Sequence, residues 1–294
     1  MRKQLSEENF AFILITPAVI IIFSIILFPI LKTLYMSFFD INLTNPFSRP
    51  FLGLGNYIEI LCSPTFWNAM IRTIYFAVVS ISIEFVLGIS IALLLNEKFY
   101  GRGLLRSLII IPWAIPTIVN GSLWRWIFNP QYGALNALLT QLGFIDSYQS
   151  WLGSPFLALN MVIVADVWKM TPLVVLMVLA GLQTIPNELY ETAGVDGANI
   201  IKRFFNITLP MLKPTILIVL ILRTMETFKV FDIIYIMTSG GPANGTQLIT
   251  YYTYREAFSY LHLSKGATLA FLISLTILGL SIFYVKSLGT KAEY

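Results

Sequence analysis

The chain has few charged residues and almost no cysteine or histidine. Charged residues occupy 12% of its 294 positions, roughly half the share found in a typical soluble domain. Cys62 is the only cysteine, which excludes an intrachain disulfide and a site built from several thiolates. His262 is the only histidine, and we interpret it as an ordinary loop residue because it has no histidine or cysteine partner.

The sequence also lacks a phosphate-binding loop of the GxxxxGK[ST] type. The chain therefore cannot bind ATP through such a loop. If its function consumes ATP, the ATPase must be another polypeptide.

Apolar sequence is abundant instead, with hydrophobic residues at 57% of positions. A helix needs about 20 apolar residues to cross the hydrocarbon core of a membrane. We predict about six such spans, near residues 11–37, 70–95, 105–128, 157–181, 212–237 and 267–287. The sequence thus predicts an all-α membrane protein, with a short N-terminal segment over 1–10, a transmembrane domain over 11–287 and a tail over 288–294.

Lysine and arginine positions indicate how the chain is oriented, because they are enriched in cytoplasmic loops. They gather in the N-terminus, the 96–106 loop, a loop over 182–212 and the tail: Arg2, Lys3, Lys98, Arg102, Arg106, Lys202, Arg203, Lys213, Lys286 and Lys291. The opposite loops hold Arg49, Arg255 and Lys265. We expect a multi-pass protein of the cell (plasma) membrane with both termini in the cytoplasm.

Prolines inside the predicted spans indicate bent or broken helices. Pro112 and Pro116 fall in the third span and Pro172 in the fourth. Such breaks are tolerated where neighbouring protein or a cavity satisfies the freed backbone groups.

The 182–212 loop is the longest amphipathic segment, and its pattern predicts two short helices. Pro186 can begin the first helix, Asp196 is a plausible N-cap for the second, and Pro210 is expected to end it.

This loop resembles the EAA loop of permease subunits of binding-protein-dependent ABC importers. The family pattern is Glu-Ala-Ala, three residues, Gly, nine residues, then Ile-x-Leu-Pro; here it reads Glu191-Thr192-Ala193, Gly197 and Ile207-Thr208-Leu209-Pro210. The departure is Thr192, a small residue. In the family the loop docks in a cleft of the ATPase, so the resemblance assigns coupling to Glu191, Thr192, Ala193, Asp196, Gly197, Leu209 and Pro210. The alternative is an ordinary amphipathic surface loop.

Two further stretches resemble sugar permeases of the maltose and trehalose type, the MalF-like branch: Ile111–Asn136 and Thr238–Phe258. The resemblance implies a type I ABC importer permease fold and transport of a di- or oligosaccharide such as trehalose or maltose. It also implies a second permease subunit in a heterodimer, two ATPase subunits that hold ATP and Mg, and an extracytoplasmic sugar-binding protein. The chain itself would be a transport subunit without enzymatic activity, cofactor, metal or nucleic acid.

Ionisable groups at membrane depth are costly unless they face water or a partner. On the fifth predicted span Arg223, Glu226, Thr227 and Val230 share one helix face, and Asp166, Lys169 and Met170 share a face of the fourth. We expect these faces to meet across a wet cavity. Glu84 is expected to be buried against a neighbouring helix.

The resemblance places the sugar site at Asp166, Lys169, Met170, Leu173, Arg223, Glu226, Thr227 and Val230. The alternative is that Arg223, Glu226, Lys229 and Asp232 form structural ion pairs within the bundle or to the second permease, which we favour for Lys229 and Asp232. A transporter driven by an ion gradient also carries intramembrane charges and broken helices, but that function gives no reason for the EAA pattern.

Overall fold

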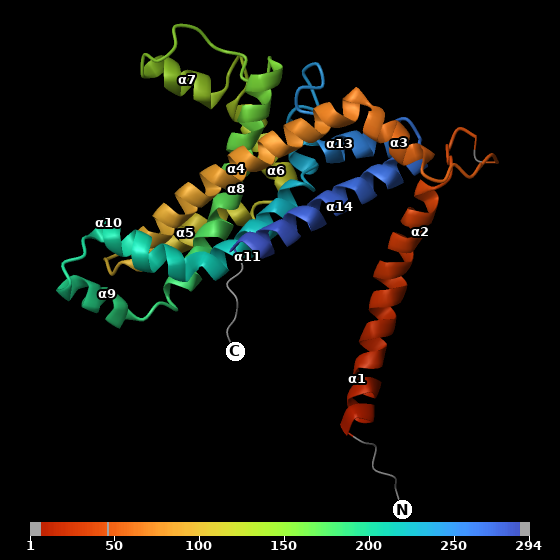
Figure 1. Cartoon of the computed structure of the whole chain (residues 1–294). Helices are drawn as coiled ribbons and strands as arrows, with labels where there is room; N and C mark the ends of the chain where they lie inside the picture. The colour runs from red at the N-terminus through yellow and green to blue at the C-terminus, as the bar shows by residue number, and fades with distance from the viewer. Residues whose placement is uncertain (1–6, 46, 289–294) are drawn as a thin grey trace, which may run out of the picture. The chain divides into compact units, whose positions relative to one another are not determined.

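The computed structural model describes residues 7–45 and 47–288. The predicted N-terminal segment 1–10 and tail 288–294 lie largely outside these described residues. The chain forms two compact units, residues 1–63 with 253–272 and residues 64–252 with 273–294. Figure 1 labels their helices.

Within the described residues, five helices are long and apolar enough to cross a membrane, and the number is six if one bent pair counts as a span. The five are Asn9–Ser37, Pro64–Asn96, Pro155–Leu182, Ile200–Thr227 and Leu263–Leu288, and the bent pair is Arg102–Ala114 with Thr117–Ile127. The predicted all-α membrane fold is confirmed.

The first unit contains the first span and the polar segments that follow it. Its helices are α1 (Glu7–Ile22), the π-helical η1 (Phe23–Leu27), α2 (Phe28–Ser37), α3 (Gly55–Cys62), η3 (Arg255–Ser259) and the start of α14 (Leu263–Leu288). The buried Asn56 Nδ2 donates to the carbonyls of Ser37 at 2.9 Å and Phe39 at 2.8 Å. These bonds hold the end of α2 against α3.

The second unit holds the rest of the bundle. Its helices are α4 (Pro64–Asn96), α5 (Arg102–Ala114), α6 (Thr117–Ile127), α7 (Ala134–Gln141), α8 (Pro155–Leu182), α9 (Asn187–Val195), α10 (Ile200–Arg203), the π-helical η2 (Phe204–Thr208), α11 (Leu209–Thr227), α12 (Asp232–Met237), most of α13 (Ile249–Tyr254) and the end of α14. Helix α7 precedes α8 and α9 follows it, so these two short helices lie at opposite ends of the unit (Figure 1).

Helix α4 packs along α8, and Gly88 permits their close approach. A Cβ atom on Gly88 would lie 2.6 Å from Val174 Cγ1. One apolar cluster, which includes Phe76 and Ile163, lies toward one end of this pair, and a second, which includes Ala92, lies toward the other.

The fifth span ends earlier than the sequence predicts. Helix α11 stops at Thr227, where the prediction extended it to 237. Thr227 Oγ1 donates to the carbonyl of Arg223 at 2.6 Å, and the Thr250 hydroxyl donates to the carbonyl of Val230. Beyond Thr227 the backbone bonds tighten to an i→i−3 pattern, in which Lys229 N–H donates to the carbonyl of Glu226 at 3.0 Å and Val230 N–H to that of Thr227 at 3.2 Å. Val230 therefore lies beyond the helix rather than on its face, which corrects the prediction.

Two proline predictions are also wrong in part. Pro210 does not end a helix, because α10, η2 and α11 continue as one helical span from Ile200 to Thr227. The π-helical turn η2 precedes it, and Leu209 N–H donates to the carbonyl of Phe204. Helix α8 continues through Pro172 without a break.

The third span breaks as predicted, with an angle of 94° between α5 and α6. Ile115 is extended at the break and Pro116 follows it. The carbonyls at the end of α5 therefore need partners from elsewhere.

Candidate functional site

The 182–212 loop begins with α9, which ends in a Schellman motif. Ala198 N–H donates to the carbonyl of Ala193 at 2.8 Å and Gly197 N–H to that of Gly194 at 3.1 Å. Gly197 has φ of 73°, a left-handed conformation that favours glycine. The sharp turn after α9 therefore depends on Gly197.

Asn199, and not Asp196, caps the second helix of the loop. Asn199 Oδ1 accepts a hydrogen bond from Lys202 N at 2.8 Å. Asp196 instead follows α9 as its C-cap residue, so the predicted N-cap is wrong by three positions. The sequence also offered Asn199 as an N-cap, because asparagine and aspartate are about equally favourable at that position.

Two contacts fix α9 against the chain that returns to the bundle. Arg203 Nε donates to the carbonyl of Ala198 at 2.9 Å, and the hydroxyls of Tyr190 and Thr208 lie 2.9 Å apart. These contacts make the loop an ordered helical hairpin.

The outer surface of this hairpin carries an exposed apolar patch among polar residues. Val195 is 89% exposed and Ile200 is 85% exposed, with Ile201 and Phe205 beside them in the sequence. The predicted coupling residues Glu191, Thr192, Asp196 and Gly197 are exposed, and Ala193, Leu209 and Pro210 are half-buried. An exposed apolar patch rimmed by polar residues is typical of a protein–protein contact.

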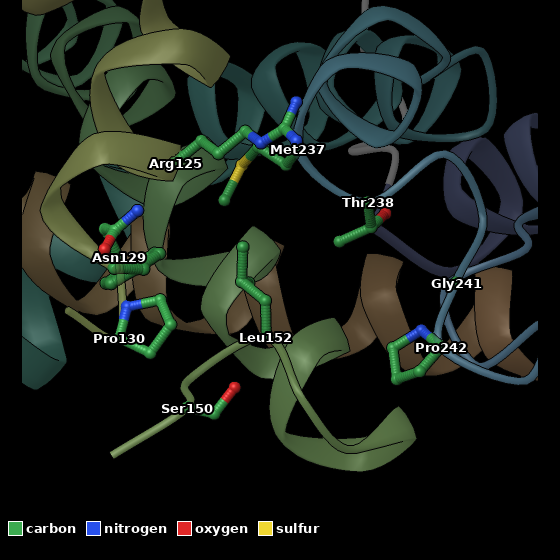
Figure 2. A pocket seen from close by; sticks show the side chains of 10 residues that line it. Arg125, Asn129, Pro130, Ser150, Leu152, Met237, Thr238, Gly241 and Pro242 are labelled. Atoms are coloured by element: carbon green, nitrogen blue, oxygen red, sulfur yellow. The ribbon is translucent and has the colours of Figure 1, made fainter. Parts of the chain in front are cut away.

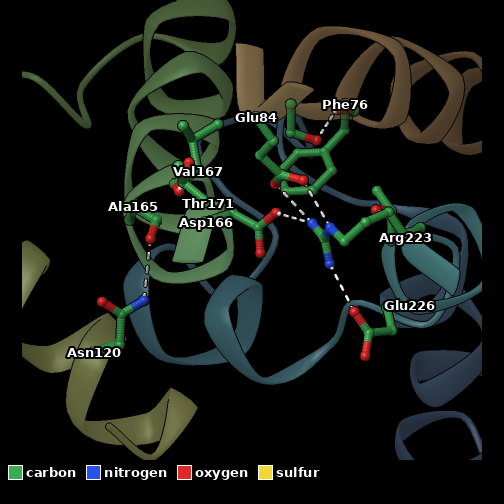
Figure 3. Close-up of polar contacts among 11 residues, drawn as sticks. Phe76, Glu84, Asn120, Ala165, Asp166, Val167, Thr171, Arg223 and Glu226 are labelled. Atoms are coloured by element: carbon green, nitrogen blue, oxygen red, sulfur yellow. Dashed lines mark hydrogen bonds and ion pairs between the residues drawn. The ribbon is translucent and has the colours of Figure 1, made fainter. Parts of the chain in front are cut away.

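At the centre of the bundle, Arg223 joins three helices (Figure 3). Its Nε and Nη2 donate to the two carboxylate oxygens of Glu84 on α4 at 2.6 and 2.7 Å. Nη2 also donates to Asp166 Oδ2 on α8 at 3.2 Å, and Nη1 to Glu226 Oε2 on α11 itself at 2.9 Å. Glu84 and Arg223 are buried, which satisfies the requirement that charges in a low-dielectric interior be paired.

A cavity of about 300 Å³ adjoins this cluster. It is lined by Trp113, Thr117, Asp166, Lys169, Met170, Arg223, Glu226, Lys229, Val230, Phe231, Asp232 and Ile233. Of the eight predicted sugar-site residues, Leu173 and Thr227 are not in this lining. Thr227 is buried and donates to its own helix, whereas Leu173 is half-buried.

Lys169 connects the cavity to the broken span. Its Nζ donates to the carbonyls of Ile115 at 2.7 Å and Trp113 at 3.4 Å. A cation at the C-terminal end of a helix is favourable, since the last carbonyls have no helical partner. Lys169 thus holds the end of α5 in place.

Among the described residues of this chain, Lys229 and Asp232 form no ion pair, so the predicted pairing within the bundle is not observed, and pairing with the second permease stays a prediction. Both side chains are exposed, and neither has an opposite charge within the 4.0 Å that defines an ion pair. Because the helix ends before them, they lie at the rim of the cavity instead of on one helix face.

The sequence interpretation missed three features of this cavity. Trp113 and Thr117 line the cavity from either side of the α5–α6 break. Each of them directly follows a proline, Pro112 or Pro116, and this position could have indicated that they lie at the break. Glu84 was expected to be buried, but its pairing with Arg223 was not foreseen. A lone arginine in a membrane span needs a carboxylate partner, and this need could have identified Glu84.

A second hollow, of about 380 Å³, lies where the two stretches that resemble sugar permeases meet (Figure 2). Arg125 and Asn129 come from the first stretch, and Thr238 and Pro242 from the second. Arg125 Nη1 also donates to the carbonyl of Ile236 at 3.4 Å. The two stretches therefore form one surface in the folded chain.

Comparison with known proteins identifies the family. Residues 84–288 match the family described as the binding-protein-dependent transport system inner membrane component. The chain belongs to this family. It is therefore a multi-pass membrane subunit of an ABC importer.

The curated relatives cover nearly the whole chain. It is 41% identical to the trehalose/maltose transport system permease protein MalF of Thermococcus litoralis, over 95% of this chain and 94% of that protein. It is 37% identical to the sulfoquinovosyl glycerol transport system permease protein SmoG of Agrobacterium fabrum, over 98% and 92%. It is 34% identical to the trehalose transport system permease protein SugA of Mycobacterium tuberculosis, over 99% and 92%.

Among solved structures, the fold is similar to a chain of a bacterial ABC transporter involved in the import of the acidic polysaccharide alginate. The TM-score is 0.81, the identity is 22%, and 94% of each chain is covered. This likeness establishes the type I importer permease fold. The alternative of a carrier driven by an ion gradient has no support among these relatives.

Proposed function

We propose that this chain forms part of the pathway through which an ATP-driven importer moves a di- or oligosaccharide such as trehalose or maltose. The observation that carries the proposal is the polar cavity inside the apolar bundle. Its wall offers the carboxylates of Asp166 and Glu226 as acceptors, Lys169 as a donor and the ring of Trp113 as a flat apolar surface. Sugar hydroxyls need such donors and acceptors, and sugar rings pack against aromatic faces. The names of the trehalose and maltose relatives support the same substrate class.

The helical hairpin of residues 182–212 is the surface that contacts the ATPase in this proposal. Its apolar residues supply buried contact area, and Glu191 in α9 supplies a carboxylate for a basic side chain of the partner. Two such ATPase subunits hold ATP and Mg. When ATP closes the pair, the hairpins move with them and rock the permease halves between inward-open and outward-open states.

Two further partners follow from the same proposal. A second permease subunit completes the pathway, because one set of about six helices forms only half of it. An extracytoplasmic sugar-binding protein releases the sugar into the pathway from the side of the membrane that faces away from the ATPase. The lysine and arginine distribution supports cytoplasmic positions for both termini and for the hairpin.

Glu191→Ala tests the coupling role in the intact complex. We expect sugar uptake and sugar-stimulated ATP hydrolysis to fall about tenfold or more, the scale of losing a central interface residue. Glu97→Ala is the matched control, because Glu97 is also exposed but lies in the loop between α4 and α5. Unchanged uptake in Glu191→Ala would refute the coupling role.

The energy source is tested separately by inhibitors. Vanadate should stop uptake, whereas a protonophore should leave it largely intact over the first minutes. The reverse result would refute ATP-driven import.

A further inference from the structure

Arg223 lies at the cavity, but its hydrogen-bonding capacity is already used by the protein. A guanidinium has five N–H donors. Two bonds go to Glu84, one to Asp166 and one to Glu226, so one donor on Nη1 remains. Its side chain is also only 1% exposed. Arg223 therefore has little left to offer a ligand.

Lys169, the second cation near the cluster, is also held by the protein. Two of its three donors go to the carbonyls of Ile115 and Trp113 at the broken span. Its remaining donor can serve one hydroxyl. By contrast, the Glu226 side chain is 50% exposed and has one carboxylate oxygen outside the bond to Arg223.

The charges around the cavity favour an uncharged ligand. The lining holds three cations, Lys169, Arg223 and Lys229, and three carboxylates, Asp166, Glu226 and Asp232. Glu84 lies directly behind Arg223 and accepts from it through both carboxylate oxygens. With every one of these groups ionised, the sum is one unit negative, and an anionic sugar would enter against that charge.

We propose that Glu84 is a positioning residue that makes this cavity select uncharged sugars over acidic ones. Glu84 acts through Arg223, because its carboxylate holds the guanidinium in a bidentate contact and cancels its charge. The names of similar proteins differ in their sugars, since one relative is named for trehalose and maltose and another for sulfoquinovosyl glycerol. The inference rests on the proposed sugar function, and it concerns a residue outside the cavity lining.

The size of the effect follows from electrostatics. At an effective dielectric constant of about 20, a unit charge about 10 Å from an anion changes its binding constant by about tenfold. A neutral sugar feels no such change. Removal of the Glu84 charge should therefore alter the ratio of the two affinities and leave the affinity for the neutral sugar nearly constant.

The experiment measures ligand binding by saturation-transfer-difference NMR on the purified complex in detergent, without the binding protein. The neutral probes are maltose and trehalose, and the acidic probe is digalacturonic acid. In Glu84→Gln we expect the preference for the neutral probe to fall about tenfold, or roughly 1.4 kcal/mol. Glu59→Gln is the matched control, because it removes the same charge from an exposed pair with Lys265 in the other unit.

A double variant separates selection from simple structural support. Glu84→Gln with Arg223→Met restores the charge balance of the cavity, so we expect the preference to return to within about threefold of the parent. The double variant also allows the test if Glu84→Gln alone fails to fold, because it leaves no buried arginine without its main carboxylate partner. Loss of neutral-sugar binding in a folded double variant would show that Arg223 is a ligand contact and overturn the inference.

The remaining outcomes are distinct. If the parent complex binds the neutral probe but Glu84→Gln keeps the parental ratio, the role of Glu84 is overturned while the sugar function stands. If neither neutral probe binds the parent complex, the proposed sugar function fails, and the inference fails with it.

Discussion

Arg223→Met should destabilise the folded protein strongly, because it leaves buried carboxylates without a counter-charge. Glu84 is fully buried and Asp166 nearly so, and both depend on this guanidinium. Breaking a buried pair by removing one partner costs about 3–5 kcal/mol. Methionine keeps most of the side-chain volume, so the loss of unfolding free energy reflects the missing positive charge rather than an empty cavity.

The measurement is thermal unfolding of the detergent-purified complex, followed by size-exclusion chromatography after heating. A loss of 3–5 kcal/mol corresponds to a fall in Tm of about 10 °C for a domain of this size. Arg102→Met is the control, since Arg102 Nη1 makes only long bonds to the carbonyls of Asn96 and Glu97, at 3.4 and 3.2 Å. It should lower Tm by less than about 3 °C.

A second change tests the physical reason. Adding Glu84→Gln to Arg223→Met removes the most deeply buried orphan charge, so the double variant should recover a large part of the lost stability. Residues in one ion-pair network are expected to show such non-additive effects. If Arg223→Met melts within about 3 °C of the parent, the assignment of this cluster as the polar centre of the fold is wrong.

The other predictions concern packing, the broken span and the hairpin. Gly88→Ala should destabilise the complex by about 1–3 kcal/mol in the same melting assay, because the new Cβ would overlap Val174. Gly279→Ala in α14 is the control and should be neutral or stabilising, because a Cβ there would meet nothing within 4 Å. Lys169→Met should lower the sugar uptake rate because the carbonyls of Ile115 and Trp113 lose their donor, and Lys169→Arg should restore part of it; equal uptake by all three proteins would contradict the role of Lys169. Asn199→Ala should cost about 1 kcal/mol locally and raise amide hydrogen exchange in α10, while Asp196→Ala should leave that exchange unchanged.

Much of the fold could be predicted because membrane spans leave a strong signal. A run of about 20 apolar residues defines each helix whatever its neighbours are, and the bend near Pro116 follows from its missing N–H. The end of α11 could not be predicted in the same way. There the backbone bonds change to an i→i−3 pattern, from Lys229 to Glu226 and from Val230 to Thr227, and no residue type in the sequence marks that change.

The candidate cavity was predictable only as far as helical periodicity reaches. Asp166 and Lys169 lie on one turn of α8, and their common position in the lining agrees with that spacing. The partner of Arg223 was not predictable from spacing, because Glu84 is 139 positions away and the two residues meet only through helix packing. The cap at Asn199 was missed because Asp196 offers an equally plausible side chain.

The central claim is that this chain moves a sugar as one subunit of an ATP-driven importer. The most direct measurement is mild-detergent purification of the chain from its native membrane, with mass spectrometry of the co-purifying proteins and an assay of ATP hydrolysis with and without sugar-loaded binding protein. We predict a second permease and an ATPase in the eluate, and hydrolysis that rises when the loaded binding protein is added. A chain that purifies alone after mild cross-linking, or hydrolysis that does not respond to sugar, would contradict the account.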